Sequence, residues 1–95
     1  MILQLIRFKT GLTLEEVMQM VERRKPEFIK VPGLAQKYYV KDKQTGELAG
    51  IYLWETEEAL RTYMQSDLAK SIPSAYKLQE PPRVEIFEVA FKLRS

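Results

Sequence analysis

The sequence predicts a single α+β domain, spanning residues 1–95, with four strands and two helices. Four segments rich in branched and aromatic residues have the character of strands. Two further segments repeat apolar residues at helical spacing. Hydrophobic residues make up 45% of the chain and charged residues 29%, which is the composition of an ordinary folded domain. The expected order of elements is strand, helix, strand, strand, helix, strand.

The first strand is expected over residues 2–9, ILQLIRFK, which contain neither Gly nor Pro. Thr13 is the predicted N-cap of the first helix, and Glu16, three residues later, completes a capping box. Pro26 predicts that this helix ends or kinks near Lys25. The buried stripe of the helix is predicted from five apolar residues: Leu14, Val17, Met18, Val21 and Phe28.

The second and third strands are expected to form a hairpin. A Pro32-Gly33 turn precedes the second strand, residues 34–42, and the turn at residues 44–47, QTGE, leads into the third strand, residues 48–55. Alternation in the second strand predicts two faces: Leu34, Tyr38 and Val40 on one, Lys37 and Lys41 on the other. The third strand is apolar on both faces, as expected of a central strand covered on both sides.

The second helix is expected from about residue 57 to 70, followed by a loop and a last strand over residues 83–93, RVEIFEVAFKL. The predicted apolar stripe of this helix consists of Ala59, Leu60, Tyr63, Met64 and Leu68. Three prolines bound the loop: Pro73, Pro81 and Pro82.

This order is that of the ferredoxin-like βαββαβ plait, with an antiparallel four-stranded sheet and both helices on one face. The other sheet face would be bare in a monomer. The third strand nevertheless carries apolar residues on both faces, with Ile51 and Leu53 on one and Tyr52 and Trp54 on the other. Because exposed apolar area is costly, we expect a homodimer formed through the open sheet face, which would make a dimeric α+β barrel.

The charge and the missing residue types narrow the possible functions. A net charge of +2 gives little reason to expect nucleic acid or a membrane as a partner. The chain has no cysteine and no histidine, which removes thiolate metal sites and the commonest general base, metal ligand and haem ligand. Without a signal-peptide pattern or a long apolar run, a cytoplasmic protein is expected.

The residues also resemble a known family. The LQL of the first strand, the Pro32-Gly33 turn, the stretch AGIYLWETEEALRTY and the FEV of the last strand resemble the dimeric α+β barrel proteins of the antibiotic-biosynthesis monooxygenase group, most of all the small YdhR-like monooxygenases. The resemblance covers essentially the whole chain. The most specific part runs from Gly50 to Trp54 and from Ala59 to Tyr63.

The resemblance implies oxygenation without a metal or flavin cofactor. In such relatives a phenol or anthrone is deprotonated and its carbanion reduces O₂ directly, with a Trp, Asn and Tyr set holding the substrate. This chain contains no asparagine, and Gln4 is the nearest amide substitute. The haem-degrading branch needs an axial histidine. Tyr63 stands where that branch has an aromatic residue and Pro73 falls near the histidine position, so haem breakdown in its usual form is rejected.

Four residues are therefore candidates for a site. Tyr63 and Gln4 are the candidate catalytic residues, and Tyr52 and Trp54 the candidate substrate-binding residues. For the aromatic residues the alternative is plain core packing, with each hydroxyl or indole N–H finding a polar partner. Aromatic residues on the third strand could also suggest an RNA-binding sheet, but the sequence signature of that fold is absent.

The main hypothesis is a cofactor-independent monooxygenase, an oxidoreductase, that acts on a small planar hydroxyaromatic substrate such as a phenol, anthrone or quinol. The alternative is a non-catalytic small-molecule-binding or stress-related homodimer of the same fold. A cofactor-free isomerase or dehydratase is a third possibility.

Overall fold

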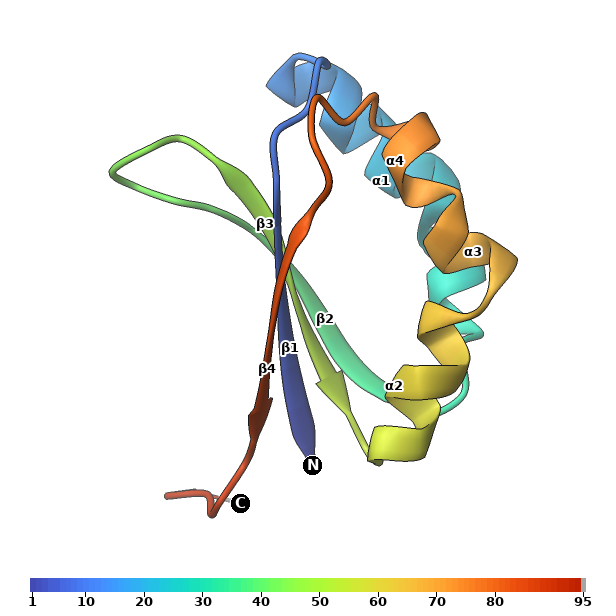
Figure 1. Ribbon diagram of the computed structural model, residues 1–95, viewed down its shortest axis with the longest axis vertical. Coiled ribbons are helices and arrows are strands. Elements are labelled where there is room, and N and C mark those ends of the chain that lie inside the picture. The colour runs from blue at the N-terminus through green and yellow to red at the C-terminus, as the bar shows by residue number, and fades with distance from the viewer. Residues whose placement is uncertain (95) are drawn as a thin grey trace.

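The computed structural model describes residues 1–94 and has two layers, a four-stranded antiparallel sheet and a layer of helices (Figure 1). All the helices lie on one side of the sheet, and its other side is bare. The elements are β1 (Ile2–Phe8), α1 (Leu14–Ile29), β2 (Leu34–Lys41), β3 (Leu48–Trp54), α2 (Glu57–Met64), α3 (Asp67–Lys70), α4 (Ile72–Ala75) and β4 (Arg83–Glu88). The sheet order is β2-β3-β1-β4, so the predicted ferredoxin-like α+β fold is confirmed. Over the described part of the chain, no helix combines the length and apolar character needed to cross a membrane.

The register of the two central strands decides which side chains share a face. Gln4 of β1 lies opposite Tyr52 of β3, and Ile2 lies opposite Trp54. Ile2, Gln4, Tyr52 and Trp54 are all buried, which places them on the face that the helices cover. The alternate residues of both strands therefore face the bare side.

Helix α1 begins as predicted but ends later. Thr13 and Glu16 form the reciprocal capping box. The helix then continues through Pro26 to Ile29, so the predicted end near Lys25 is wrong. Proline removes one backbone hydrogen bond, but the turn beyond it packs the buried Phe28 against the core, which favours continuation.

The predicted stripe of α1 is only partly buried. Val17 and Phe28 are buried, whereas Leu14 and Met18 are 49% and 61% exposed. Both exposed side chains line a groove of about 380 Å³ between α1 and the sheet, together with Phe8 and Leu48. Helical periodicity identified the correct face, but it could not show that a groove separates the first turns of α1 from the sheet.

The second helical segment is interrupted, where one helix over residues 57–70 was expected. Helix α2 ends at Met64, and the Ser66 side chain caps a new short helix, α3, by accepting a hydrogen bond from Ala69 N. A further turn, α4, then forms in the expected loop with Pro73 in its first turn. Serine favours a cap over a helix interior because its hydroxyl competes for backbone groups.

A β-bulge changes the faces of β2. The pairing with β3 shifts register between Leu34 and Gln36. Leu34 therefore packs against the helix-covered core, while Tyr38 and Val40 face the open side. The predicted grouping of these three residues on one face is wrong, because one extra residue reverses the alternation.

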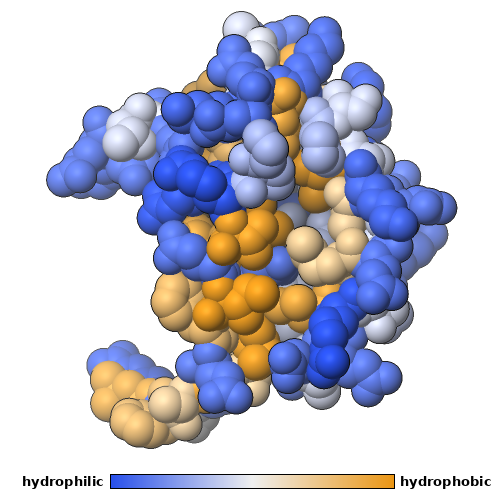
Figure 2. All heavy atoms as spheres, viewed as in Figure 1, coloured by the Kyte–Doolittle hydropathy of each residue, from blue (hydrophilic) through white to orange (hydrophobic). Residues whose placement is uncertain are grey.

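The last strand is shorter than the predicted residues 83–93. Strand β4 ends at Glu88, opposite Ile2 at the start of β1, and a final hydrogen bond joins Val89 N to Met1 O. Figure 2 shows hydrophobic residues over β4 and again on the protruding tail, where Phe91 and Leu93 are 90% and 94% exposed.

The Pro32-Gly33 turn brings α2 close to the start of β2. Gly33 has φ +78° and a Cβ placed on it would lie 2.4 Å from Ala59 Cβ. Its carbonyl accepts a hydrogen bond from Glu55 N at 2.8 Å. Glycine is thus required here both by the backbone conformation and by the close approach of α2.

Candidate functional site

The four candidate site residues lie together between the sheet and the helices. Gln4 and Trp54 are completely buried, and Tyr52 and Tyr63 are each 3% exposed. β1 contributes Gln4, β3 contributes Tyr52 and Trp54, and α2 contributes Tyr63. We call these four residues the helix-face cluster.

Gln4 anchors the cluster through both ends of its amide. Its Oε1 accepts a hydrogen bond of 3.0 Å from Trp54 Nε1, and its Nε2 donates to Met64 Sδ at 3.2 Å. A buried amide needs such partners. The protein itself supplies these partners, the Trp54 indole and the Met64 sulfur. Gln4 therefore fixes the position of the Trp54 ring.

The three aromatic rings are in mutual contact. Tyr52 and Trp54 stack with centroids 6.0 Å apart and planes at 4°. Tyr63 lies 5.1 Å from the Trp54 ring and 5.7 Å from the Tyr52 ring, tilted to both. Alternate residues of one strand project from the same face of the sheet, so β3 holds the two flat rings parallel.

The two tyrosine hydroxyls of the cluster form a buried polar pair. Tyr52 Oη and Tyr63 Oη are 3.5 Å apart. Burial raises the pKa of Tyr52 well above its usual value, and burial also raises the pKa of Tyr63. Both groups are therefore protonated at neutral pH, when they can donate a hydrogen bond but are poor proton acceptors.

Lys37 belongs to the same site although the sequence did not single it out. The bulge in β2 places it opposite Tyr52, on the helix-covered face. Its Nζ lies 3.5, 4.4 and 4.6 Å from the ring centroids of Phe28, Tyr39 and Tyr52. Burial, with a smaller contribution from Arg24, lowers the pKa of Lys37 to about 7. The signal that could have identified it is a lysine followed by two tyrosines, in a strand expected to pair with the strand that carries Tyr52.

Two spaces meet at Lys37. An inner cavity of about 30 Å³, the size of one water molecule, is lined by Tyr52 and by Tyr39, Gly50, Ile72 and Tyr76, among others. An outer groove of about 510 Å³ runs between α1 and β2. Lys37 and Tyr39 line both spaces. We call them the inner cavity and the α1–β2 groove.

The other members of the cluster differ in how they can be reached. Tyr63 lines a separate groove of about 420 Å³ beside the Pro32-Gly33 turn. Gln4 and Trp54 line neither the inner cavity nor these grooves. A ligand at the inner cavity therefore meets Tyr52 directly, and the stacked Trp54 lies behind it.

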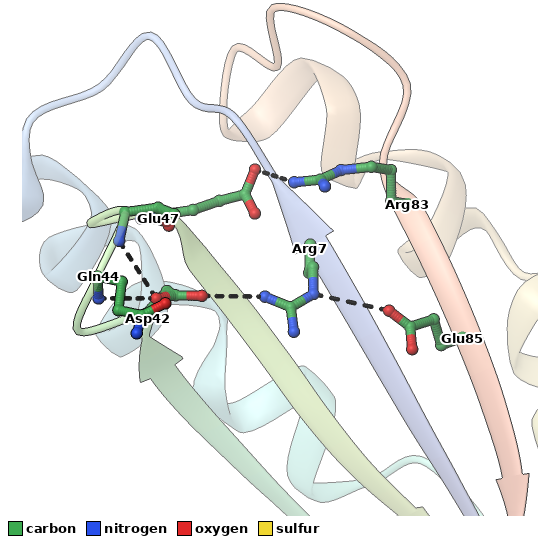
Figure 3. Close-up of polar contacts among 7 residues, drawn as sticks. Arg7, Asp42, Gln44, Glu47, Arg83 and Glu85 are labelled. Carbon is green, nitrogen blue, oxygen red and sulfur yellow. Dashed lines mark hydrogen bonds and ion pairs between the residues drawn. The ribbon is translucent and has the colours of Figure 1, made fainter.

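The open sheet face has a charged end, drawn in Figure 3. Arg7 lies between Asp42, at 3.3 Å, and Glu85, at 3.7 Å, and Arg83 pairs with Glu47. Backbone N–H groups in the β2–β3 turn, followed by Arg7, lower the pKa of Asp42. These ion pairs are structural, because every charge in them is already paired.

Side chains that could ligate a metal are dispersed. Among residues 1–94, no three acidic side chains gather where they could share an ion.

Comparison with known proteins identifies the family. The family model described as "Putative mono-oxygenase ydhR" matches residues 2–94, almost the whole chain. The chain belongs to the YdhR family. The resemblance inferred from the AGIYLWETEEALRTY stretch is thereby confirmed, and the chain is a member of a monooxygenase family. No curated protein matches the sequence.

Solved structures share the fold at low sequence identity. SnoaB from Streptomyces nogalater, a cofactor-independent oxygenase, is 16% identical over 99% of this chain and 97% of its own, with a TM-score of 0.77. Rv0793 from Mycobacterium tuberculosis is 12% identical over 98% of both chains, with a TM-score of 0.74. A dimeric ferredoxin-like protein of unknown function from Thermobifida fusca is 14% identical over 93% of this chain and 90% of its own, with a TM-score of 0.71. At these identities the likeness establishes the fold of this YdhR-family protein.

Proposed function

We propose that this YdhR-family protein is a cofactor-independent monooxygenase that acts on a small planar hydroxyaromatic compound such as a phenol, anthrone or quinol. The family match over residues 2–94 carries the proposal. SnoaB, a cofactor-independent oxygenase, has the same fold, and this chain has no cysteine or histidine with which to bind a metal or haem.

The geometry of the helix-face cluster supports the substrate class. Tyr52 presents a flat ring at the inner cavity and is backed by the parallel ring of Trp54. Flat aromatic walls favour flat aromatic ligands. Tyr63, protonated at neutral pH, would donate a hydrogen bond to a substrate or peroxide oxygen, and Gln4 would hold Trp54 in place. The inner cavity holds only one water in this conformation, so a substrate must displace lining side chains.

The open sheet face supports a homodimer. Leu3 and Leu5 of β1 and Ile51 and Leu53 of β3 share this face, and none of them is covered by a helix. Phe87 on the same face is 48% exposed. A second copy would bury this apolar strip. Light scattering should give twice the mass of one chain, and Leu53→Glu should return the monomer mass with the helix content retained.

The first test of function uses the single tryptophan. Titration with anthrones, quinols and flavonoid-like phenols should quench Trp54 fluorescence saturably, and the ligands that bind should then support oxygen uptake without added metal or flavin. Tyr63→Phe should lower turnover roughly 10- to 100-fold, since it removes a hydrogen-bond donor to the reacting oxygen while keeping the ring. Tyr38→Phe, on the open face, is the matched control. Unchanged kinetics in Tyr63→Phe would remove this residue from the mechanism.

One observation favours the alternative, a non-catalytic binding protein. Both ends of the Gln4 amide already have partners within the protein, Trp54 and Met64, and the inner cavity is small. Saturable quenching without oxygen uptake across the whole panel would decide for this alternative.

A further inference from the structure

The proposed reaction begins with loss of a proton from the substrate, and the helix-face cluster contains no good acceptor for it. The amide group of Gln4 does not accept a proton at neutral pH. Tyr52 and Tyr63 keep their hydroxyl protons, because burial raises the pKa of each. An acceptor must be uncharged or anionic near neutral pH and must lie within reach of the ligand.

Lys37 is the amine that meets both conditions. Its Nζ sits among the rings of Phe28, Tyr39 and Tyr52, and the residue lines both the inner cavity and the α1–β2 groove. None of the ion pairs or side-chain hydrogen bonds found among residues 1–94 involves the Lys37 amine. A partly buried amine without a carboxylate partner is costly to keep charged.

The groups around Lys37 shift its pKa in opposite directions. Burial and the Arg24 guanidinium favour the neutral amine and bring the pKa of Lys37 to about 7. The three ring faces favour the ammonium. The titratable or charged groups that face this site are Glu22, Arg24 and Lys25 of α1, Tyr39 of β2, Tyr52 of β3, Tyr63 of α2, and Tyr76 just after α4. Of these, Tyr39 also keeps its proton, since burial raises its pKa to about 12.

The α1–β2 groove provides the space for a ligand beside this amine. Its volume of about 510 Å³ lies in the range of small-molecule sites. Phe28, Ile29 and Leu34 give it an apolar wall. Because Lys37, Tyr39 and Val21 line both the groove and the inner cavity, movement of the flexible lysine side chain would join the two spaces.

We propose that Lys37 is the proton acceptor of the site, taking the hydroxyl proton of a planar hydroxyaromatic substrate and then pairing with the anion it has formed. This assignment rests on the proposed function. In the step, the substrate O–H bond breaks, its electron pair stays on oxygen, and an N–H bond forms at Nζ, so a neutral pair becomes a phenolate–ammonium pair. The attraction between the two new charges lowers the pKa of the bound phenol and raises that of the amine, which offsets their difference in acidity.

The first experiment measures the titration of the Lys37 amine in the absence of a ligand. NMR titration of protein labelled at lysine Cε, with the Lys37 signal assigned by its loss in Lys37→Met, should give a midpoint at least about one unit below that of Lys41, the control on the same strand. Equal midpoints for the two lysines would overturn the assignment.

The second experiment follows the proton. The probe is 2-naphthol, a planar hydroxyaromatic whose anion absorbs at longer wavelength than its neutral form, at about pH 8, where Lys37 is neutral and the free probe is protonated. Wild type should form the bound anion with no net proton release. Lys37→Arg, which is always protonated, should release one proton for each anion formed. Lys37→Met should reduce anion formation at least roughly tenfold, and Lys41→Met should leave it unchanged.

The outcomes separate this inference from the proposed function. Failure of wild type to form the bound anion, or anion formation that Lys37→Met leaves unchanged, would overturn the role of Lys37. Oxygen uptake that is equal in wild type and Lys37→Met would overturn that role but leave the monooxygenase proposal standing. Lys37-dependent anion formation with no oxygen uptake for any substrate would support the proton acceptor and refute the monooxygenase. Equal thermal stability of the variants checks that the differences do not come from unfolding.

Discussion

The hydrogen bond between Gln4 and Trp54 is the contact on which the arrangement of the helix-face cluster most depends. Gln4→Leu keeps the volume of the side chain and removes the acceptor of Trp54 Nε1. Because Trp54 is completely buried, water cannot replace that acceptor. An orphaned buried N–H costs about 1–3 kcal/mol, and the gain from a more apolar side chain offsets part of this cost. We expect Gln4→Leu to lower the free energy of unfolding by about 1–2 kcal/mol.

A double-mutant cycle isolates this bond. In the Trp54→Phe background no indole N–H remains to be orphaned, so Gln4→Leu should be neutral or stabilising there. The coupling energy should therefore reach about 1 kcal/mol or more. Urea unfolding followed by circular dichroism, at one fixed protein concentration, measures all four proteins, since fluorescence is lost with Trp54. Gln19→Leu, an exposed position on α1, is the matched control and should stay within about 0.5 kcal/mol of wild type.

Two results would refute this reasoning. Additive effects within about 0.5 kcal/mol would mean that the two side chains are not coupled. An unchanged stability of Gln4→Leu in the Trp54 background would mean that the indole N–H finds another partner.

Four further predictions concern the pH dependence of stability, the Gly33 turn and the cap of α1. The free energy of unfolding should rise from about pH 7 to pH 10, because the pKa of Lys37 is about 7 in the folded protein and 10.5 as its ordinary value. Urea titrations across this pH range should show a flatter rise in Lys37→Met. Above about pH 10 the free energy of unfolding should fall, because Tyr52 keeps its proton in the folded protein, where burial raises its pKa, and loses it in the unfolded chain. Gly33→Ala should destabilise by about 1–3 kcal/mol, since the new methyl group collides with Ala59 at a positive φ; a wild-type melting temperature would contradict the tight approach of α2. Thr13→Ala should cost about 1 kcal/mol of stability through the lost capping box, with Thr13→Ser as the control that keeps it.

Local sequence signals predicted the elements whose causes are local. The capping box at Thr13 and Glu16 and the hairpin turn at residues 44–47, where Gly46 has φ +75°, depend on a few neighbouring residues and appear as predicted. The extent of an element depended on its partners instead. Strand β4 ends at Glu88, opposite Ile2 of β1, and α1 passes through Pro26 because Phe28 is buried beyond it.

The candidate site was found in part because strand alternation is also local. Tyr52 and Trp54 are two residues apart on one strand, so they share a face whatever the rest of the chain does. The sequence alone thus determined the order of elements, the shared face of these aromatic residues and, through the family resemblance, the monooxygenase family. Only the tertiary structure decided that the helices cover this face, that Gln4 meets Trp54, and that a single bulge in β2 turns Lys37 toward Tyr52. These contacts join residues far apart in the chain. They are set by strand register and side-chain packing, which leave no periodic pattern in the sequence.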